Sequence, residues 1–276
     1  MNRTTQILLE LALVALIASP ALADELSFTT GPPNGAMAVA SRPDTGGVLE
    51  IEAADDFLLG SQASVTGATF TGIVPTGANV LQVVVEIYRV FPNDSTQPPD
   101  GKVPTRMNSP SDVAFGSRSS GSDLTFTTAT LSSSFTAANS VLNGIHPAPF
   151  QKTGGEGSVT GQEVQFDVHF ANPFNLPADH YFFVPQVQLS NGSDFFWLSA
   201  ARPNVIDPFS PDLQAWVRNG DLDPDWLRVG TDIVGGNPAP MFNMSFSIET
   251  PEPATALLLI VGITGIAGLR KKSKQG

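Results

Sequence analysis

From Val80 to Phe91 the sequence reads VLQVVVEIYRVF. β-Branched and aromatic residues dominate this run, which is typical of a β-strand. Its apolar residues follow one another instead of alternating strictly with polar ones. A strand that is half exposed shows alternation, whereas one that is covered on both faces does not. The run therefore predicts a central strand of a sheet.

A second stretch, from Gln162 to Phe170, does alternate. Its odd-numbered positions are polar and its even-numbered positions after Gln162 are apolar. Because successive side chains of a strand point to opposite faces, this pattern predicts a strand with one buried and one solvated face. The residues expected to be buried are Val164, Phe166, Val168 and Phe170.

The rest of the chain repeats this kind of pattern, with short β-rich runs separated by Gly, Pro, Ser and Asn and almost no helical periodicity. Such a sequence is typical of an all-β protein. We predict a single antiparallel β-sandwich of jelly-roll type spanning residues 24–250, with long irregular segments at 92–111 and 132–160. Further strands are expected at Val48–Leu59, Val65–Val74, Asp112–Phe115, Leu124–Leu131, Gly161–Phe170, Tyr181–Leu189, Phe195–Ala200, Leu213–Arg218 and Asn243–Glu249.

Three local predictions concern how these segments are connected. The tetrapeptide Ser190–Ser193 contains Asn-Gly and predicts a β-hairpin, since Asn-Gly readily adopts positive φ. Leu142–Ile145 could form one turn of helix. The early strand at Ala53–Phe57 and the last strand at Asn243–Glu249 are expected to lie close together, as the ends of a domain often do.

The C-terminal 26 residues have a different organisation. Pro251, Glu252 and Pro253 precede an uncharged apolar run at 254–269, and Arg270-Lys271-Lys272 follow it. As a helix the run would be ~24 Å long, which is short of the ~30 Å hydrocarbon core of a bilayer. The sequence thus predicts a marginal transmembrane helix whose basic end stays cytoplasmic.

This tail resembles the PEP-CTERM sorting signal of Gram-negative bacteria that make exopolysaccharide. The resemblance covers only residues 251–276, and the order of motif, helix and basic cluster makes it specific. It implies recognition of Pro251, Glu252 and Pro253 by an exosortase, a membrane-embedded enzyme, with Arg270, Lys271 and Lys272 as the stop. It further implies cleavage near the motif and delivery to the cell surface or matrix. An ordinary single-span anchor is the alternative.

The N-terminus has the features of a secretory signal peptide over residues 1–23. Arg3 precedes a mostly apolar segment, and Ala21 and Ala23 fit a small-x-small cleavage site before Asp24. Together the two ends predict an exported protein with a transient membrane intermediate. A buried N-terminal helix is the alternative for the first segment.

Composition excludes several classes of function. The chain has a formal net charge of −12, and it contains no cysteine. An acidic surface repels nucleic acid and anionic lipid, so no nucleic-acid partner is expected. The lack of cysteine excludes disulfides, thiol catalysis and Cys-ligated metal centres.

Catalytic motifs are absent from the sequence. The three histidines, His146, His169 and His180, have no metal-ligand spacing, and no Gly-x-Ser-x-Gly elbow occurs. Asp55 and Asp56 are adjacent on a predicted strand and should face opposite sides. We therefore expect no enzymatic activity and no cofactor, with a secreted hydrolase as a remaining alternative.

The acidic segment Asp221, Asp223 and Asp225, with Asp232 further on, has acids at positions one, three, five and twelve of a calcium-type loop. Trp226 stands where such a loop needs Gly, and Pro224 stiffens it. The sequence leaves two interpretations open, a calcium site and an acidic turn in which Asp side chains cap backbone N–H groups.

Aromatic residues give the second functional hypothesis, a carbohydrate-binding module on the same sorting tail. Trp197, Trp216 and Trp226 could stack on sugar rings if they were exposed, although aromatic residues in strands usually pack in the core. The first hypothesis is a non-catalytic protein of the cell surface or of an exopolysaccharide or biofilm matrix. The segments Ala54–Phe57 and Leu176–Tyr181 resemble segments of uncharacterised β-sandwich ectodomains that precede such tails.

Overall fold

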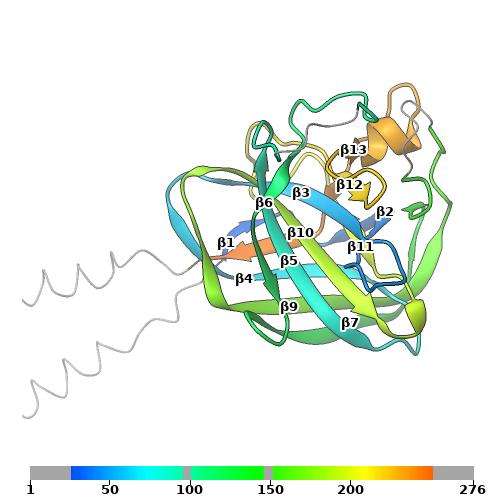
Figure 1. The fold of residues 1–276 in the computed structure, drawn as a ribbon. Helices are drawn as coiled ribbons and strands as arrows, with labels where there is room; N and C mark the ends of the chain where they lie inside the picture. The colour runs from blue at the N-terminus through cyan, green and yellow to red at the C-terminus, as the bar shows by residue number, and fades with distance from the viewer. Residues whose placement is uncertain (1–25, 96–100, 146–151, 251–276) are drawn as a thin grey trace, which may run out of the picture. The chain divides into compact units, whose positions relative to one another are not determined.

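β-Strands dominate the computed structural model, which describes residues 26–95, 101–145 and 152–250. The signal peptide, the sorting tail and His146 fall outside these residues. The predicted all-β class is confirmed, since helical structure in the described chain is limited to the short turns η1 (Ser190–Gly192) and η2 (Val229–Val234). The strands form two sheets of nine and six strands (Figure 1).

The nine-stranded sheet branches at β4, which pairs along both of its edges. One edge of β4 pairs with β9, which in turn pairs with β7, and the other edge pairs with β15 and then with β11. The pair between β2 and β8 is parallel, and the other pairs are antiparallel. The strands of this sheet are β1 (Leu26–Thr29), β2 (Pro33–Ala40), β4 (Ala63–Val74), β7 (Leu124–Ala137), β8 (Ser140–Val141), β9 (Val159–Leu176), β11 (Phe196–Ala200), β14 (Asn243–Met244) and β15 (Phe246–Glu249).

The six-stranded sheet is antiparallel throughout, in the order β13-β12-β3-β10-β5-β6. Figure 1 shows β3, β10 and β5 crossing the front of the molecule, with β7 and β9 at the bottom of the view. The strands are β3 (Ile51–Leu59), β5 (Val80–Val90), β6 (Pro110–Ser119), β10 (Asp179–Leu189), β12 (Trp216–Asn219) and β13 (Leu227–Arg228).

The main core contains side chains from both sheets. Phe183 of β10 stacks on Phe246 of β15 with ring centroids 5.2 Å apart, and Trp197 of β11 lies 5.8 Å from the same ring. Burial of such rings supplies most of the hydrophobic driving force, at about 25 cal/mol per Å² of apolar area. The strands from different parts of the chain are thereby held in one core.

The alternating segment behaves as predicted. Val164, Phe166, Val168 and Phe170 are buried, whereas Asp167 and His169 are exposed. The segment from Val80 to Phe91 is also confirmed as an inner strand, because its strand β5 is paired on both sides, by β10 and β6. Its outward face is only partly covered, however, and β3 is the strand that is buried on both faces from Ile51 to Phe57.

The predicted hairpin at Ser190–Ser193 is wrong. Asn191 and Gly192 do adopt positive φ, at 60° and 65°. Yet β10 pairs with β3 and β5, while β11 pairs with β2, β4 and β14 in the other sheet. The turn η1 therefore links two sheets. Local turn chemistry fixes the direction change, but the partners of each strand are chosen by side chains distant in sequence.

Other differences concern elements that the sequence pattern hides. Strands β1, β2, β8 and β13 lie where no strand was expected, and part of the segment predicted as irregular at 132–160 continues β7 and begins β9. Leu142–Ile145 is a turn without helix. The predicted proximity of the early and last strands is confirmed, because the Met244 N–H donates to Asp55 Oδ2 at 2.7 Å.

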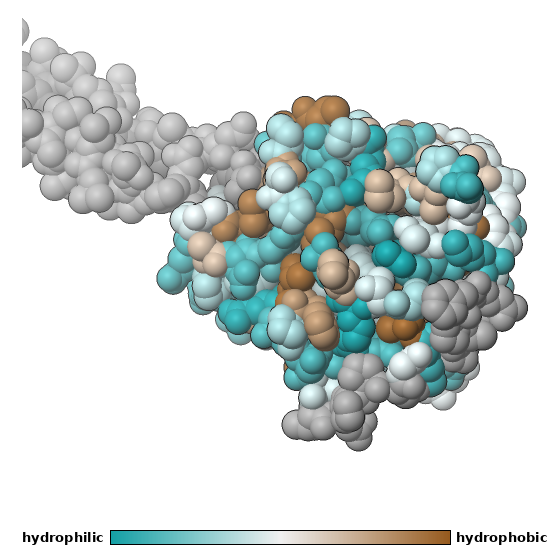
Figure 2. Space-filling view, turned by 90° about the horizontal axis from the view of Figure 1, so that it is seen from above, coloured by the Kyte–Doolittle hydropathy of each residue, from teal (hydrophilic) through white to brown (hydrophobic). Residues whose placement is uncertain are grey.

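A second, smaller apolar cluster covers the outer face of the six-stranded sheet. Tyr88, Phe182, Val184, Trp216 and Trp226 are buried there, although they face away from the main core. The molecular face in Figure 2 is mainly hydrophilic, with apolar residues in small groups between polar ones. The outer cluster is also where the buried charged side chains described below gather.

Candidate functional site

The described chain begins and ends on one pair of neighbouring strands. Strand β1 pairs antiparallel with β15, so that Leu26 lies opposite Glu249. In Figure 1 the first strand, in blue, lies beside the last one, in orange, at the left of the molecule. The predicted cleavage residues Ala21, Ala23 and Asp24 precede this pair in the sequence, and the sorting residues of 251–276 follow it.

All the residues predicted for export and sorting lie outside the described chain. The sorting residues are Pro251, Glu252, Pro253, Arg270, Lys271 and Lys272. Within the part of the chain that the structure describes, no helix is both long enough and apolar enough to cross a bilayer.

The acidic segment that suggested calcium does not bring its carboxylates together on one point. Asp223 lies 3.1 Å from Arg218, Asp225 pairs with Arg106, and Asp232 pairs with Arg228 at 2.6 Å. Asp221 is exposed, and its backbone N–H donates to Asn219. Among residues 26–95, 101–145 and 152–250, no cluster of three acidic or histidine side chains is arranged to hold a metal ion.

Asp232 illustrates the turn-capping alternative. Its carboxylate accepts hydrogen bonds from the backbone N–H of Arg228 at 2.8 Å and from the Arg228 guanidinium at 2.8 and 2.6 Å. These contacts fix the start of the π-helical turn η2. Side-chain capping of backbone N–H groups is a common role of Asp in turns.

Arg106 gathers three carboxylates from three separate segments. It pairs with Asp94 at 3.1 Å and also with Asp112 and Asp225, both of which have fully buried side chains. The guanidinium also lies 4.8 Å from the centroid of the Phe91 ring. Of these three acids only Asp225 belongs to the predicted calcium-type loop, and its partner is this cation. The cation fastens the loop between β5 and β6 to the 221–226 turn.

Arg218 of β12 is the centre of a second buried network. It forms an ion pair with Glu52 of β3, and its guanidinium donates to the hydroxyl oxygen of Tyr88 at 2.9 Å. The Tyr88 hydroxyl in turn donates to Glu52 at 2.7 Å or to Glu86 at 2.8 Å. Burial and Glu52 raise the pKa of Tyr88, so this hydroxyl stays protonated and remains a donor.

Two acids near these networks have raised pKa values. Burial, together with Glu52, raises the pKa of Glu86 to about 7. Burial raises the pKa of Asp56 to about 6, even though His180 and the Leu213 N–H favour its ionised form. Raised pKa values of this kind occur in active sites, but also in structural networks.

The geometry around Asp56 does not assemble a hydrolytic site. Asp56 Oδ2 accepts from His180 Nε2 at 2.6 Å, and the neighbouring ring of Phe209 lies 6.0 Å from the imidazole. Within the described residues, His180 has no serine or threonine hydroxyl as a hydrogen-bond partner. As predicted, Asp55 is held separately, by the Met244 N–H of the last strand segment.

The tryptophans do not form a surface platform. Trp197, Trp216 and Trp226 are each at most 1% exposed. Trp197 Nε1 donates to the Ser245 carbonyl at 2.9 Å, and Trp226 Nε1 donates to the Ser111 carbonyl at 3.3 Å. The interpretation of Trp197 as a core residue is confirmed. Sugar stacking on any of these rings would need the surrounding residues to move.

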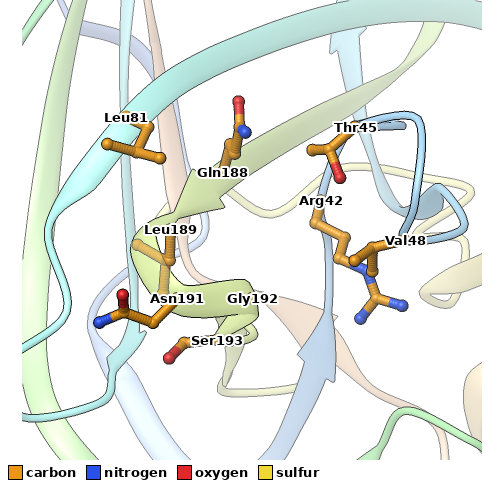
Figure 3. A pocket seen from close by; sticks show the side chains of 9 residues that line it. All are labelled: Arg42, Thr45, Val48, Leu81, Gln188, Leu189, Asn191, Gly192 and Ser193. Carbon is orange, nitrogen blue, oxygen red and sulfur yellow. The ribbon is translucent and has the colours of Figure 1, made fainter.

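A shallow cavity of about 340 Å³ lies beside the turn η1. Figure 3 shows Arg42, Thr45 and Val48 on one side and Leu81, Leu189 and Asn191 on the other. Leu81 is 58% exposed. Arg42 pairs with Asp194, so its charge is already balanced. The lining mixes amide, hydroxyl and aliphatic groups and holds no pair of convergent acids.

The sequence could not have identified these networks as units. Glu52, Tyr88 and Arg218 belong to three strands, separated by many residues, and only their pairing in the sheet aligns them. No protein-family model, no curated protein and no solved structure matches this chain. The functional assignment therefore rests on the two ends of the sequence and on the geometry of the domain.

Proposed function

We propose that this protein is an exported, non-catalytic component of the cell surface or of an exopolysaccharide matrix. In this proposal an N-terminal signal peptide directs export, and the PEP-CTERM tail holds the chain in the inner membrane until an exosortase cleaves it. The domain between them is proposed to be a jelly-roll-like β-sandwich, which the joint packing of the two sheets in one core supports.

The pairing of β1 with β15 is the observation that carries the proposal. Leu26 and Glu249 are opposite one another, so the segments to be cleaved join the domain at neighbouring points. A domain with adjacent ends can be attached through both at once without extending its own strands. Cleavage of either segment also removes no residue of the described strands, and the fold keeps all of its core.

The charge of the chain is consistent with an extracellular location. The chain is acidic, with a formal charge of −12, and it relies on no disulfide. Several buried acids contact an arginine, and Asp112 and Asp225 share Arg106. An acidic exterior favours solubility after release.

Replacement of Glu252 by alanine tests the sorting step in the native host. We expect Glu252→Ala to accumulate as an uncleaved, membrane-retained form, because the motif recognised by the exosortase is lost. Lys274→Ala, beyond the basic cluster, is the matched control and should be processed normally. Subcellular fractionation followed by intact-mass measurement of the released protein reports both ends of the chain. Released native protein that still contains Lys274, or normal cleavage of Glu252→Ala, would refute the proposal.

Polysaccharide binding is the second candidate function. The cavity in Figure 3 favours it, since polar Thr45, Gln188 and Asn191 lie beside the exposed aliphatic side chain of Leu81. Retention of the protein on the host's own exopolysaccharide is the test, and Leu81→Asp should abolish it while leaving the fold intact. Trp216→Ala and Trp226→Ala are unsuitable probes because both side chains belong to a core.

A further inference from the structure

A second cavity, of about 250 Å³, lies at the edge of the outer apolar cluster, beside β12 and β13. It is smaller than the ~300 Å³ at which pockets for drug-sized ligands begin, so it suits a single small ring. Trp216 and Arg228, which are opposite one another on these strands, belong to its lining. The other lining residues are Thr105, Met107, Asn108, Arg202, Asp212, Leu213, Gln214 and Met241.

Trp216 carries a buried hydrogen-bond donor that has no acceptor. Its side chain is 1% exposed, and within the described residues its Nε1–H has no hydrogen-bond partner. The other two tryptophans differ, since Trp197 and Trp226 both donate to backbone carbonyls. An unpaired buried donor is destabilising, and native proteins keep few of them. Beside a cavity, such a donor indicates an acceptor that the chain itself does not supply.

Two more donors of the same lining are available. The carboxamide oxygen of Gln214 accepts from the Thr231 hydroxyl at 2.9 Å, and its Nε2 has no partner in the part of the chain that the structure describes. Nε and Nη2 of Arg228 donate to Asp232, which leaves Nη1 without a partner among those residues. The cavity therefore offers donors from three side chains and fits a ligand that presents acceptors.

Charge and the rim of the cavity narrow the ligand further. Both arginines of the lining are already paired, Arg228 with Asp232 and Arg202 with Asp212. On a chain with a formal charge of −12, these neutralised arginines favour a neutral acceptor over an anion. The exposed side chains of Met107 and Met241 give the rim flexible apolar groups. A carbonyl oxygen next to a methyl group matches both features.

We propose that this cavity binds the acetamido group of an N-acetylated sugar residue. The carbonyl oxygen has two lone pairs and accepts from Trp216 Nε1 and Gln214 Nε2. The methyl group contacts the methionines of the rim, and the sugar hydroxyls accept from Arg228 Nη1. The site shares no lining residue with the cavity in Figure 3, and it does not depend on the proposed sorting function.

The three indole N–H groups report this contact directly. Proton–nitrogen correlation spectra of the purified full chain are recorded during titration with N-acetylglucosamine, and Trp216→Phe identifies the Trp216 signal. We expect only the Trp216 indole proton to move downfield, saturably, because it gains an acceptor. The signals of Trp197 and Trp226, whose donors are already paired, should stay in place. D-Glucose, which has no acetamido group, should move none of the three.

A pair of variants tests the second donor. Gln214→Glu keeps an acceptor for the Thr231 hydroxyl but replaces the Nε2 donor by a carboxylate oxygen, so the affinity should fall about tenfold or more. Gln188→Glu makes the same change in the cavity of Figure 3 and should leave the affinity unchanged. Unmoved Trp197 and Trp226 signals show that each variant is folded.

Four outcomes would overturn the proposal. They are a Trp216 signal that does not move, an equal response to D-glucose, equal affinities of Gln214→Glu and Gln188→Glu, and a response to D-glucuronate in place of N-acetylglucosamine, which would identify an anion site. N-Methylacetamide is the remaining arm of the titration. If this bare amide moved the Trp216 signal as far at the same concentration, the sugar would be the wrong ligand.

Discussion

The guanidinium of Arg218 lies over the indole ring of Trp226, with its central carbon 4.4 Å from the ring centroid. The second aromatic partner is Tyr88, whose ring centroid is 5.3 Å away. Arg218 thus contacts two neighbouring aromatic rings on the outer face of a sheet while it pairs with the buried Glu52. Cation–π contact and the ion pair act on the same group, so its replacement affects both.

We expect Arg218→Met to reduce the free energy of unfolding by about 3–5 kcal/mol, because it leaves the buried Glu52 without its cation. Urea denaturation measures the change. The double variant Glu52→Gln/Arg218→Met should recover part of the loss, since no charge then remains unpaired. Asp179→Asn, which disrupts an exposed pair with Arg89, is the control and should cost no more than about 1 kcal/mol. A single variant as mild as this control would contradict the structural role of Arg218.

The pH dependence of stability should be opposite to that of a protein with salt-bridged acids of lowered pKa. Burial raises the pKa of Glu86 from 4.5 to about 7. The folded state therefore binds more protons than the unfolded state between these values, and stability falls as pH rises through this window. Asp56, with a pKa of about 6, and Asp55, whose pKa burial also raises, act in the same direction.

Thermal unfolding recorded from pH 4.5 to 8 checks this expectation. Glu86→Gln should flatten the decline in Tm and stabilise the protein at pH 8, because the amide cannot ionise. Asp44→Asn removes a charge of the same sign at an exposed position and should leave the slope unchanged. If the stability of the unaltered protein rose with pH across this range, the raised pKa of Glu86 would not govern the pH dependence of stability.

Close packing of β4 against β9 should make Gly161 intolerant of a side chain. A Cβ there would lie 2.6 Å from Ile73 Cγ2 and 2.9 Å from the Val74 carbonyl oxygen. We expect Gly161→Ala to reduce the free energy of unfolding by about 1–3 kcal/mol through overpacking. Gly60→Ala has open space around it and should change stability by less than about 0.5 kcal/mol. Comparable denaturation midpoints for the two variants would show that the strands adjust freely.

Arg106 should control the order of the loop between β5 and β6. Its guanidinium connects Asp94 of that loop to Asp112 of β6 and to Asp225. Arg106→Ala leaves two buried carboxylates without a cation, so we expect faster limited proteolysis within residues 101–109. Arg42→Ala removes a different arginine–aspartate pair and should not expose this loop. Unchanged cleavage in Arg106→Ala would mean that other contacts suffice to hold it.

The sequence predicted a strand correctly where the order of polar and apolar residues within the segment shows which side chains are buried. The alternation from Gln162 to Phe170 predicted which side chains are buried, because the two faces of a strand differ by one residue in sequence. The continuous run from Val80 predicted an inner strand. The short strands β8 and β13 could not be predicted in this way, since two residues show no period.

The sequence alone determined the all-β class, the absence of disulfides and the composition of the two ends, because each follows from residue type and short-range order. Only the tertiary structure decided which strands are neighbours. The neighbours in turn decide which partners the polar side chains have. Asn191-Gly192 sets a turn locally, but the strands on either side enter different sheets because their apolar faces fit different partners. Arg106, Arg218 and Arg228 separate the acids that spacing had grouped, since ion pairs form between residues that the fold brings together.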